Sequence, residues 1–486
     1  MQQRPGCVRR VVKFKYSAIG SYAEGVDMAT KDEVIILVTG TNRYLPSNAP
    51  CPPSGSRLTL ASGVGLSICL RLIDEFLATR PETQSLKLIF TTRSQRKSND
   101  TLTQLQKHLH SLSIPAALKE RVTLRPEHVD LCDLVSVRAL SRRLNSSLPK
   151  LDAVILNAGI AGFVGLNWFK AVWAVMTDLV HAVTWPSSYT LSAPGLLAKK
   201  QTNLPDEPSL GQVFCANVFG HYMLCHNLAP LLSKPTDPPG RIIWTSSLEA
   251  TRSSFNLDDI QAVQTHRPYE AVKYLTDLLS LTASHPSSAP WVDSFLSTKD
   301  NRTISNGTTS SPSPSKPNIY VTHPGVCATS IMPLMLPLVY AMLAATWLAR
   351  LAGSPWHLMS SYLGAVSPVW LALSSQSVLD SAEAVYRKLG GGRVKWGSSC
   401  DRLGRESVVC TEVEGWGYGG VIGGPVTEAD KARRRKRGAN NLTAEEKVEF
   451  EELGRKCWRE MEELRVQWDE ILDRAEAEEG QAPLAN

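Results

Sequence analysis

The sequence lacks the features that mark several large classes of protein. Its ten cysteines are scattered, with no C-x-x-C pair and no histidine partner at metal-ligand spacing, which predicts reduced thiols and no metal site. The N-terminal residues are too polar to form the apolar core of a secretory signal. The formal net charge is only +6 over 486 residues, which argues against a dedicated nucleic-acid-binding protein.

The composition is that of a globular protein with a large core. Apolar residues make up 43% of the chain and charged residues 20%, and the length exceeds that of most single domains. One large α/β core with additional segments is therefore expected. Residues 1–27 follow neither a helical nor a strand pattern, so we interpret them as a non-native or disordered extension before a start at Met28.

A tyrosine and a lysine four residues apart indicate a candidate catalytic site. Tyr269 and Lys273 share one face of a predicted helix, so a ligand along that face would meet both side chains. A phenol is normally protonated at neutral pH, and a neighbouring ammonium favours its anion. Tyr269 is therefore expected to exchange a proton with a carbonyl or alcohol oxygen. The pattern is common by chance, so its weight depends on the motifs around it.

Four short motifs at the ends of apolar runs stand around this pair. They are Thr39-Gly40, Asn157-Ala158-Gly159, Ser246-Ser247 and His323-Pro324-Gly325. In this order they resemble the short-chain dehydrogenase/reductase superfamily. The local sequence is similar to one branch, the fungal 3-keto-steroid reductases, from about Met28 to the C-terminus. The segments that carry this second resemblance are 241–250, 399–402 and 414–420.

The resemblance implies a doubly wound parallel sheet of the Rossmann type. About seven strands would carry helices on both faces, with an apolar helical appendage and a C-terminal charged helix. The expected divisions are an NADP-binding domain over 28–330, an apolar membrane-contact or substrate-lid region over 331–425, and a basic linker with an amphipathic helix over 426–486.

The glycine-rich turn expected after the first strand is interrupted. In the family its glycines let the backbone approach a pyrophosphate at a helix N-terminus. Here 19 residues, 43–61, separate the two halves of the motif. The insert is either an unspliced in-frame intron or a genuine surface loop, and the first is favoured because the flanks join into the family pattern without it. The cofactor-binding residues implied on the two sides are Thr39, Gly40, Asn42, Ser62, Gly63 and Gly65.

Other residues are implied in binding NADP(H). Arg93 follows the second predicted strand, where an acid would select NAD and an arginine suits the 2′-phosphate of NADP(H). Alternatively it is a solvated side chain at a strand end. Asp130 resembles the family's adenine-binding aspartate, or is an ordinary residue at a strand end. The resemblance adds five further residues. Asn157 would tie strand ends together, Tyr269 and Lys273 would also contact the cofactor, and Gly325 and Thr329 would lie near the nicotinamide carboxamide.

The resemblance also implies two further catalytic residues. Ser247, the second serine of its pair, is chosen over Ser246 and would hydrogen-bond the substrate carbonyl. Asn217, in a long helix predicted over 211–232, matches the asparagine that holds a proton-relaying water near Lys273. The 22 residues from Ser247 to Tyr269 predict an additional loop over the site.

Several segments lie outside these motifs. The Trp-rich stretch 163–197 is either a buried helical excursion or one wall of an apolar pocket. Residues 284–316 form a predicted low-complexity loop. The segment 331–349 contains no charged residue. It would span a membrane, lie in the membrane surface or close over the substrate as a lid, and contact with the membrane surface is favoured. The basic run 431–437 predicts a solvated linker, and the helix after Thr443 either packs on the body or binds a partner.

The expected function is the NADPH-dependent reduction of a 3-keto sterol during sterol C-4 demethylation. Sterol specificity follows from the resemblance alone, since the residues themselves indicate only a carbonyl reductase. The alternatives are a reductase of another lipid or retinoid ketone and a catalytically weak NADP-binding scaffold. The expected partners are the sterol ketone, a membrane surface and other enzymes of C-4 demethylation, with no nucleic acid. The expected location is the cytosolic face of the endoplasmic reticulum or a lipid droplet.

Overall fold

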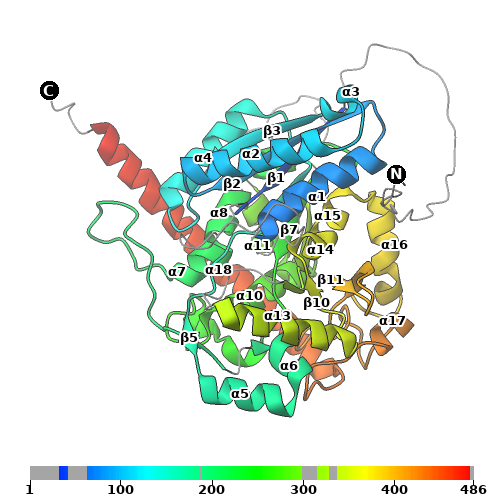
Figure 1. Cartoon of the computed structure of the whole chain (residues 1–486). Coiled ribbons are helices and arrows are strands. Elements are labelled where there is room, and N and C mark those ends of the chain that lie inside the picture. Colours follow the sequence, from blue (N-terminus) through cyan, green and yellow to red (C-terminus); the bar gives the residue numbers. More distant parts are fainter. Residues whose placement is uncertain (1–31, 42–62, 187–188, 298–314, 328–335, 482–486) are drawn as a thin grey trace, which may run out of the picture.

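The computed structural model describes residues 32–41, 63–186, 189–297, 315–327 and 336–481 (Figure 1). At its centre is an eight-stranded sheet in which only the edge strand β12 is antiparallel to its neighbour. This confirms the predicted doubly wound parallel sheet and adds one strand. In spatial order the strands are β12 (Glu406–Cys410), β11 (Lys395–Cys400), β8 (Asn318–His323), β7 (Arg241–Thr245), β4 (Ala153–Leu156), β1 (Asp32–Val38), β2 (Gln84–Thr92) and β3 (Val122–His128).

The central strands are apolar because helices cover both faces of the sheet. In β1, the four residues from Ile35 to Val38 are fully buried, so no polar alternation appears. Strand order reverses between β1 and β4, which are hydrogen-bonded neighbours. The connections after the carboxyl ends of these two strands therefore run in opposite directions, and α/β proteins bind their ligands at such a point.

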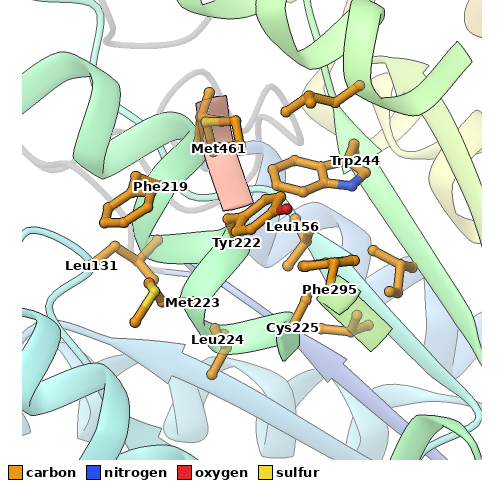
Figure 2. Close-up of a cluster of buried hydrophobic side chains, with 14 of the residues drawn as sticks. Leu131, Leu156, Phe219, Tyr222, Met223, Leu224, Cys225, Trp244, Phe295 and Met461 are labelled. Carbon is orange, nitrogen blue, oxygen red and sulfur yellow. The ribbon is translucent and has the colours of Figure 1, made fainter. Parts of the chain in front are cut away.

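One face of the sheet carries the helices that hold the predicted site. Tyr222 lies at the centre of this core, 4.3 Å from Phe295 between ring centroids, with Met461 close by (Figure 2). The covering segments are α4 (Leu134–Ser147), α7 (Gln212–Phe214), the π-helix η2 (Cys215–Phe219), α8 (Gly220–Asn227), α9 (Ala229–Leu232), α10 (Pro268–Thr282), α11 (Ala289–Leu296) and α18 (Ala444–Gln481). The long helix predicted over 211–232 is thus divided by a π turn.

The opposite face is covered by an N-terminal and a later group of helices. Phe76 and Val369, one from each group, are fully buried in the same core cluster. The helices are α1 (Val64–Thr79), α2 (Gln95–Ser111), α14 (Ser361–Gly364), α15 (Val366–Leu373) and α16 (Gln376–Arg387).

The remaining elements belong to neither the eight-stranded sheet nor the helices named above. Helix α6 packs against both α5 and α13, and the three lie together at the bottom of Figure 1. These elements are α3 (Ala116–Lys119), β5 (Phe163–Leu166), α5 (Trp168–Thr177), α6 (Leu179–Thr184), β6 (Thr190–Ser192), η3 (Arg252–Ser254), η4 (Leu257–Asp259), η5 (Pro286–Ser288), β9 (Val326–Cys327), α13 (Leu336–Leu351), β10 (His357–Met359) and α17 (Glu428–Lys431).

The structure corrects the expectation of a buried helix within 163–197. Helix α5 presents its large apolar side chains to the outside, with Phe169 93% exposed and Trp173 72% exposed. Its composition is apolar almost all round, so no polar face in the sequence marks the exposed side. The expectation thus fails for α5, whereas α6 buries Val180, Ala182 and Thr184.

Two expected segment boundaries are also corrected. Part of the predicted low-complexity loop forms η5 and α11, whose Phe295 is fully buried, while 298–314 lie outside the described residues. The region 331–425 is not an appendage as a whole, since α14–α16 cover the sheet and β11 and β12 extend it. Among the helices that the structure describes, none has the length and apolar character required to cross a bilayer.

The C-terminal segment packs on the body of the protein. The capping box of Thr443 and Glu446 is formed, and α18 lies against α10 with Phe450 and Trp468 fully buried. The basic run 431–437 is corrected from a solvated linker to a docked segment. Arg435 pairs with Glu412, and Lys436 pairs with Glu414 at 2.8 Å, because acidic residues after β12 face it.

Candidate active site

The two halves of the interrupted glycine motif lie together at the carboxyl end of β1. Gly40 has φ +69°, and a Cβ there would lie 2.6 Å from Cα of Ala158. A Cβ at Gly65 would lie 2.2 Å from the Gly40 carbonyl oxygen. Only glycine permits this approach, although the segment between the halves is outside the described residues. The first turn of α1 has no side-chain cap and no acidic residue, so its backbone N–H groups suit a pyrophosphate.

Asn157 ties the ends of β1 and β4 together, as predicted. Its amide Nδ2 donates to the carbonyls of Thr39 at 3.1 Å and Gly40 at 3.2 Å. The Thr39 hydroxyl accepts from the backbone N–H of Asn157 and lies 2.8 Å from Nε2 of His221. Burial lowers the pKa of His221 to about 3, so this imidazole is neutral and acts as a fixed hydrogen-bonding group.

The structure describes three of the other predicted cofactor residues, Arg93, Asp130 and Gly325. Arg93 is exposed directly after β2, at the edge where an adenosine ribose would lie. Asp130 follows β3, and its Oδ1 accepts from the backbone N–H of Cys132 at 3.0 Å. Gly325 has φ +65° in a turn against the Trp356 carbonyl. The remaining three, Asn42, Ser62 and Thr329, lie outside the described residues. The glycine cradle and the uncapped α1 fit a dinucleotide.

Helix α10 presents Tyr269 and Lys273 on one face, as the spacing predicts. Pro268 occupies its first turn, where the missing N–H has no partner to lose. The Tyr269 phenol lies beside the side chain of Ser247, which follows β7 and lowers the pKa of the phenol. The Ser247 Oγ also accepts from the backbone N–H of Glu249 at 3.1 Å. The serine and tyrosine hydroxyls thus converge on one point above the carboxyl edge of the sheet.

The pKa of Tyr269 differs from the sequence-based expectation. Burial raises it to about 12, and the neighbouring Ser247 side chain offsets only part of that rise. The Lys273 ammonium lies 5.6 Å from the centroid of the tyrosine ring and donates to the Thr245 carbonyl at 2.8 Å. Because burial disfavours the charged tyrosinate, the phenol stays protonated, which is the state that a proton donor needs.

Lys273 is also strongly affected by its surroundings. Burial lowers the pKa of its ammonium to about 8, Asp277 opposes that shift, and Lys395 adds to it. A lysine with this pKa changes charge close to physiological pH. The protonation state of Lys273 is therefore sensitive to small changes nearby.

The structure gives Ser246 and Asn217 buried structural contacts. The Ser246 hydroxyl donates to the Lys273 carbonyl at 3.3 Å, so this serine points away from Tyr269. Asn217 lies in the π turn η2, and its Nδ2 donates to the carbonyls of Ile160 and Val213 at 2.8 Å each. A Cβ at Gly159 would lie 2.3 Å from Asn217 Oδ1, so a larger residue at position 159 would displace the asparagine side chain.

Sequence reasoning missed Asp277 and Lys395, which form a buried ion pair at 2.7 Å next to the site. Asp277 was detectable, since it follows Lys273 by four residues on the same helix face. Lys395 stands as a single charge between Val394 and Trp396, an unusual place in a buried strand. Their partnership depends on a contact over 118 residues, which no local pattern reveals.

A cavity of about 270 Å³ lies beside this ion pair. Asp277, Lys395 and Leu248 line one side, and the docked basic segment lines another. Neither Ser247 nor Tyr269 borders it, so it is separate from the point where their hydroxyls converge.

The chain was compared with protein-family models, with solved structures and with curated proteins. No protein-family model matches it. Among solved structures, the Pseudomonas aeruginosa RhlG/NADP active-site complex is 17% identical, with a TM-score of 0.37 over 70% of this chain and 89% of that one. L-sorbose reductase from Gluconobacter frateurii, complexed with NADPH and L-sorbose, is 14% identical, with a TM-score of 0.37 over 71% of this chain and 93% of that one.

Curated relatives are much closer in sequence. The Aspergillus fumigatus 3-keto-steroid reductase erg27 is 58% identical over 455 residues, which cover 92% of this chain and 96% of the relative. The Gibberella zeae 3-keto-steroid reductase ERG27 is 39% identical, over 91% of this chain and 95% of the relative. The Schizosaccharomyces pombe 3-keto-steroid reductase erg27 is 29% identical, over 73% and 88%. The chain therefore belongs to the fungal 3-keto-steroid reductases.

Proposed function

We propose that this chain reduces the C3 ketone of a sterol to the 3β-hydroxyl group with NADPH, at the sterol C-4 demethylation stage. The observation that carries the chemistry is that Tyr269 and Lys273 share one face of α10, with the Lys273 ammonium 5.6 Å from the centroid of the tyrosine ring and Ser247 beside the phenol. The sterol class is carried by the activity for which the relatives are named, including the one at 58% identity. The bound nicotinamide cofactor supplies the hydride that adds to C3.

The chain's own residues account for the proton and for the position of the ketone. The Ser247 hydroxyl donates a hydrogen bond to the ketone oxygen and stabilises the negative charge that develops there. Tyr269, which burial keeps protonated, donates the proton that completes the alcohol. The Lys273 ammonium lies over the tyrosine ring, where it stabilises the tyrosinate left after the transfer.

The test is reduction of a panel of ketones by the purified full chain. A 3-keto sterol, a retinoid ketone and a simple lipid ketone are incubated with NADPH, and the alcohol products are identified by mass spectrometry. Formation of the 3β-hydroxysterol at the highest kcat/KM supports the proposal. Preference for another ketone favours a different lipid reductase. Failure to reduce any of them, with NADPH still bound, favours the scaffold alternative.

Arg93 is proposed to select NADPH. Arg93 is exposed, and a guanidinium can make paired, charge-assisted bonds to the 2′-phosphate, which NADH lacks. We expect Arg93→Glu to reduce the NADPH-to-NADH ratio of kcat/KM by about tenfold or more, since an acid would repel the phosphate. Arg96→Glu, an exposed arginine one turn later, is the matched control and should leave the ratio unchanged. Equal use of both cofactors by the wild type would refute the assignment.

A membrane surface is proposed to hold the enzyme at the endoplasmic reticulum or a lipid droplet, beside other enzymes of sterol C-4 demethylation. The support is the exposed apolar surface of α5 and α13, which are joined through α6 at one end of the molecule (Figure 1). Its exposed large side chains include three tryptophans and a phenylalanine, residues that enter membrane interfaces readily. The most exposed members are Phe169, Met176, Trp173, Tyr340 and Val172.

Charges placed on this surface should release the protein. We expect Phe169→Glu/Trp173→Glu to float less with phospholipid vesicles, because burying two carboxylates in the interface is unfavourable. Leu403→Glu/Val448→Glu, which alters exposed apolar residues elsewhere, is the control and should float as the wild type does. A wild type that stays in the aqueous fraction contradicts membrane contact, and flotation unchanged by the α5 variant excludes this surface.

A further inference from the structure

A buried lysine joins three parts of the active site. Lys395, the first residue of β11, donates to Oδ2 of Asp277 at 2.7 Å and to the main-chain carbonyl of Ser247 at 2.7 Å. Its side chain is 3% exposed and that of Asp277 is 1% exposed. One ammonium thus connects the loop after β7, the helix α10 and the strand β11.

Fold stability is a poor explanation for this pair. Removing a carboxylate and an ammonium from water is costly, and well-packed apolar residues of similar volume often leave a protein equally stable or more stable. An apolar pair could fill the same space between α10 and β11. It could not make the bond from Lys395 to the Ser247 carbonyl, which is the contact that reaches the reacting groups.

The bond to the Ser247 carbonyl bears on where the serine hydroxyl points. The hydroxyl accepts from the Glu249 N–H at 3.1 Å and lies beside the Tyr269 phenol, whose pKa it lowers. The carbonyl and the side chain belong to the same residue, so rotation of the Ser247 peptide would move Oγ relative to the phenol. Lys395 holds that peptide, and Asp277 holds Lys395 to the helix that carries Tyr269.

We propose that Asp277 and Lys395 are positioning residues of the reductase, which fix the Ser247 peptide against the catalytic face of α10. Asp277 lies eight residues after Tyr269 and four after Lys273, so the three side chains share a helix face. The pair sets the separation between the serine and tyrosine hydroxyls without touching the substrate. This inference rests on the proposed function and adds two residues to it.

The test separates positioning from stability with a double variant. Lys395→Met leaves Asp277 unpaired and should lower the thermal unfolding midpoint, whereas Lys395→Met/Asp277→Leu should recover it. We expect both variants to lose about 100-fold in kcat for the 3-keto sterol, because the serine is misplaced, while the sterol KM and NADPH Kd change less than about threefold.

A second ion pair, with a buried carboxylate and a partly buried guanidinium, provides the control. Glu383 and Arg393 interact at 3.1 Å, joining α16 to the segment before β11. Glu383→Leu/Arg393→Met should retain the wild-type kcat even if its unfolding midpoint changes. If kcat of the Asp277/Lys395 double variant recovers together with its midpoint, the pair serves only the fold and the proposal is overturned.

The proposal can also be judged without turnover. Crystal structures of the wild type and the double variant, each with NADPH bound, show where the Ser247 Oγ lies. A variant in which Oγ leaves the Glu249 N–H supports positioning, and an unmoved Oγ contradicts it. Wild-type protein that binds NADPH but does not reduce the sterol would count against the proposed function alone, since the position of Ser247 is read separately.

Discussion

Tyr269→Phe should abolish reduction of the sterol ketone while leaving NADPH binding nearly unchanged. The substitution removes the hydroxyl that donates the proton and keeps the ring, which packs 6.0 Å from Phe163 between centroids. A positioned general acid contributes about 100- to 10,000-fold to a rate, so a loss in kcat of that size is expected. Single-turnover kinetics with the sterol and a fluorescence titration with NADPH measure the two effects separately.

Tyr274→Phe is a closely matched control for this experiment. Tyr274 lies on the same helix, and its hydroxyl donates to the Glu414 carbonyl at 3.0 Å, on the side that faces α18. Losing that buried bond should lower the free energy of unfolding by about 1 kcal/mol and leave kcat close to that of the wild type. A Tyr269→Phe enzyme as active as Tyr274→Phe would show that another group supplies the proton.

The sequence predicts those parts of the site that depend on neighbours along the chain. Tyr269 and Lys273 share a helix face because of their spacing, and Asn157 bridges strand ends because it closes an apolar strand. The glycines also lie where the motif places them, although 43–61 separate them in sequence. Such features need only the local period and the known order of strands in a doubly wound sheet.

The remaining features depend on contacts between distant segments. Lys395 reaches Ser247 across 148 residues, and the basic segment docks through ion pairs with the loop after β12. The sequence did not predict the exposure of Phe169 for another reason. A helix that is apolar on all sides has the same composition whether it is buried or exposed. The pKa of Tyr269 was predicted in the wrong direction because spacing alone does not report burial.

Lys273→Met should weaken both NADPH binding and turnover. The resemblance places Lys273 at the cofactor ribose, and its ammonium also lies over the Tyr269 ring. We expect kcat/KM to fall by about 100-fold or more, since a preorganised charge is lost from the site. Lys234→Met, which removes an exposed lysine, is the control and should behave as the wild type. An unchanged NADPH Kd in Lys273→Met would exclude the ribose contact.

The lowered pKa of Lys273 also predicts how the wild type responds to pH. Burial lowers the pKa of Lys273 to about 8 in the folded protein, whereas the ordinary value, expected in the unfolded chain, is 10.5. Between these two pH values the unfolded chain therefore binds more protons than the folded protein. The burial penalty is therefore fully present below about pH 8 and is relieved as pH rises through this window, so the wild type should gain unfolding free energy relative to Lys273→Met. NADPH affinity should change in the opposite direction to stability. It should fall above about pH 8 as the ammonium loses its proton, and this fall should be absent from the variant. Denaturant unfolding and NADPH titrations from pH 7 to 10 measure both trends, and parallel pH profiles for the two proteins would show that Lys273 does not titrate there.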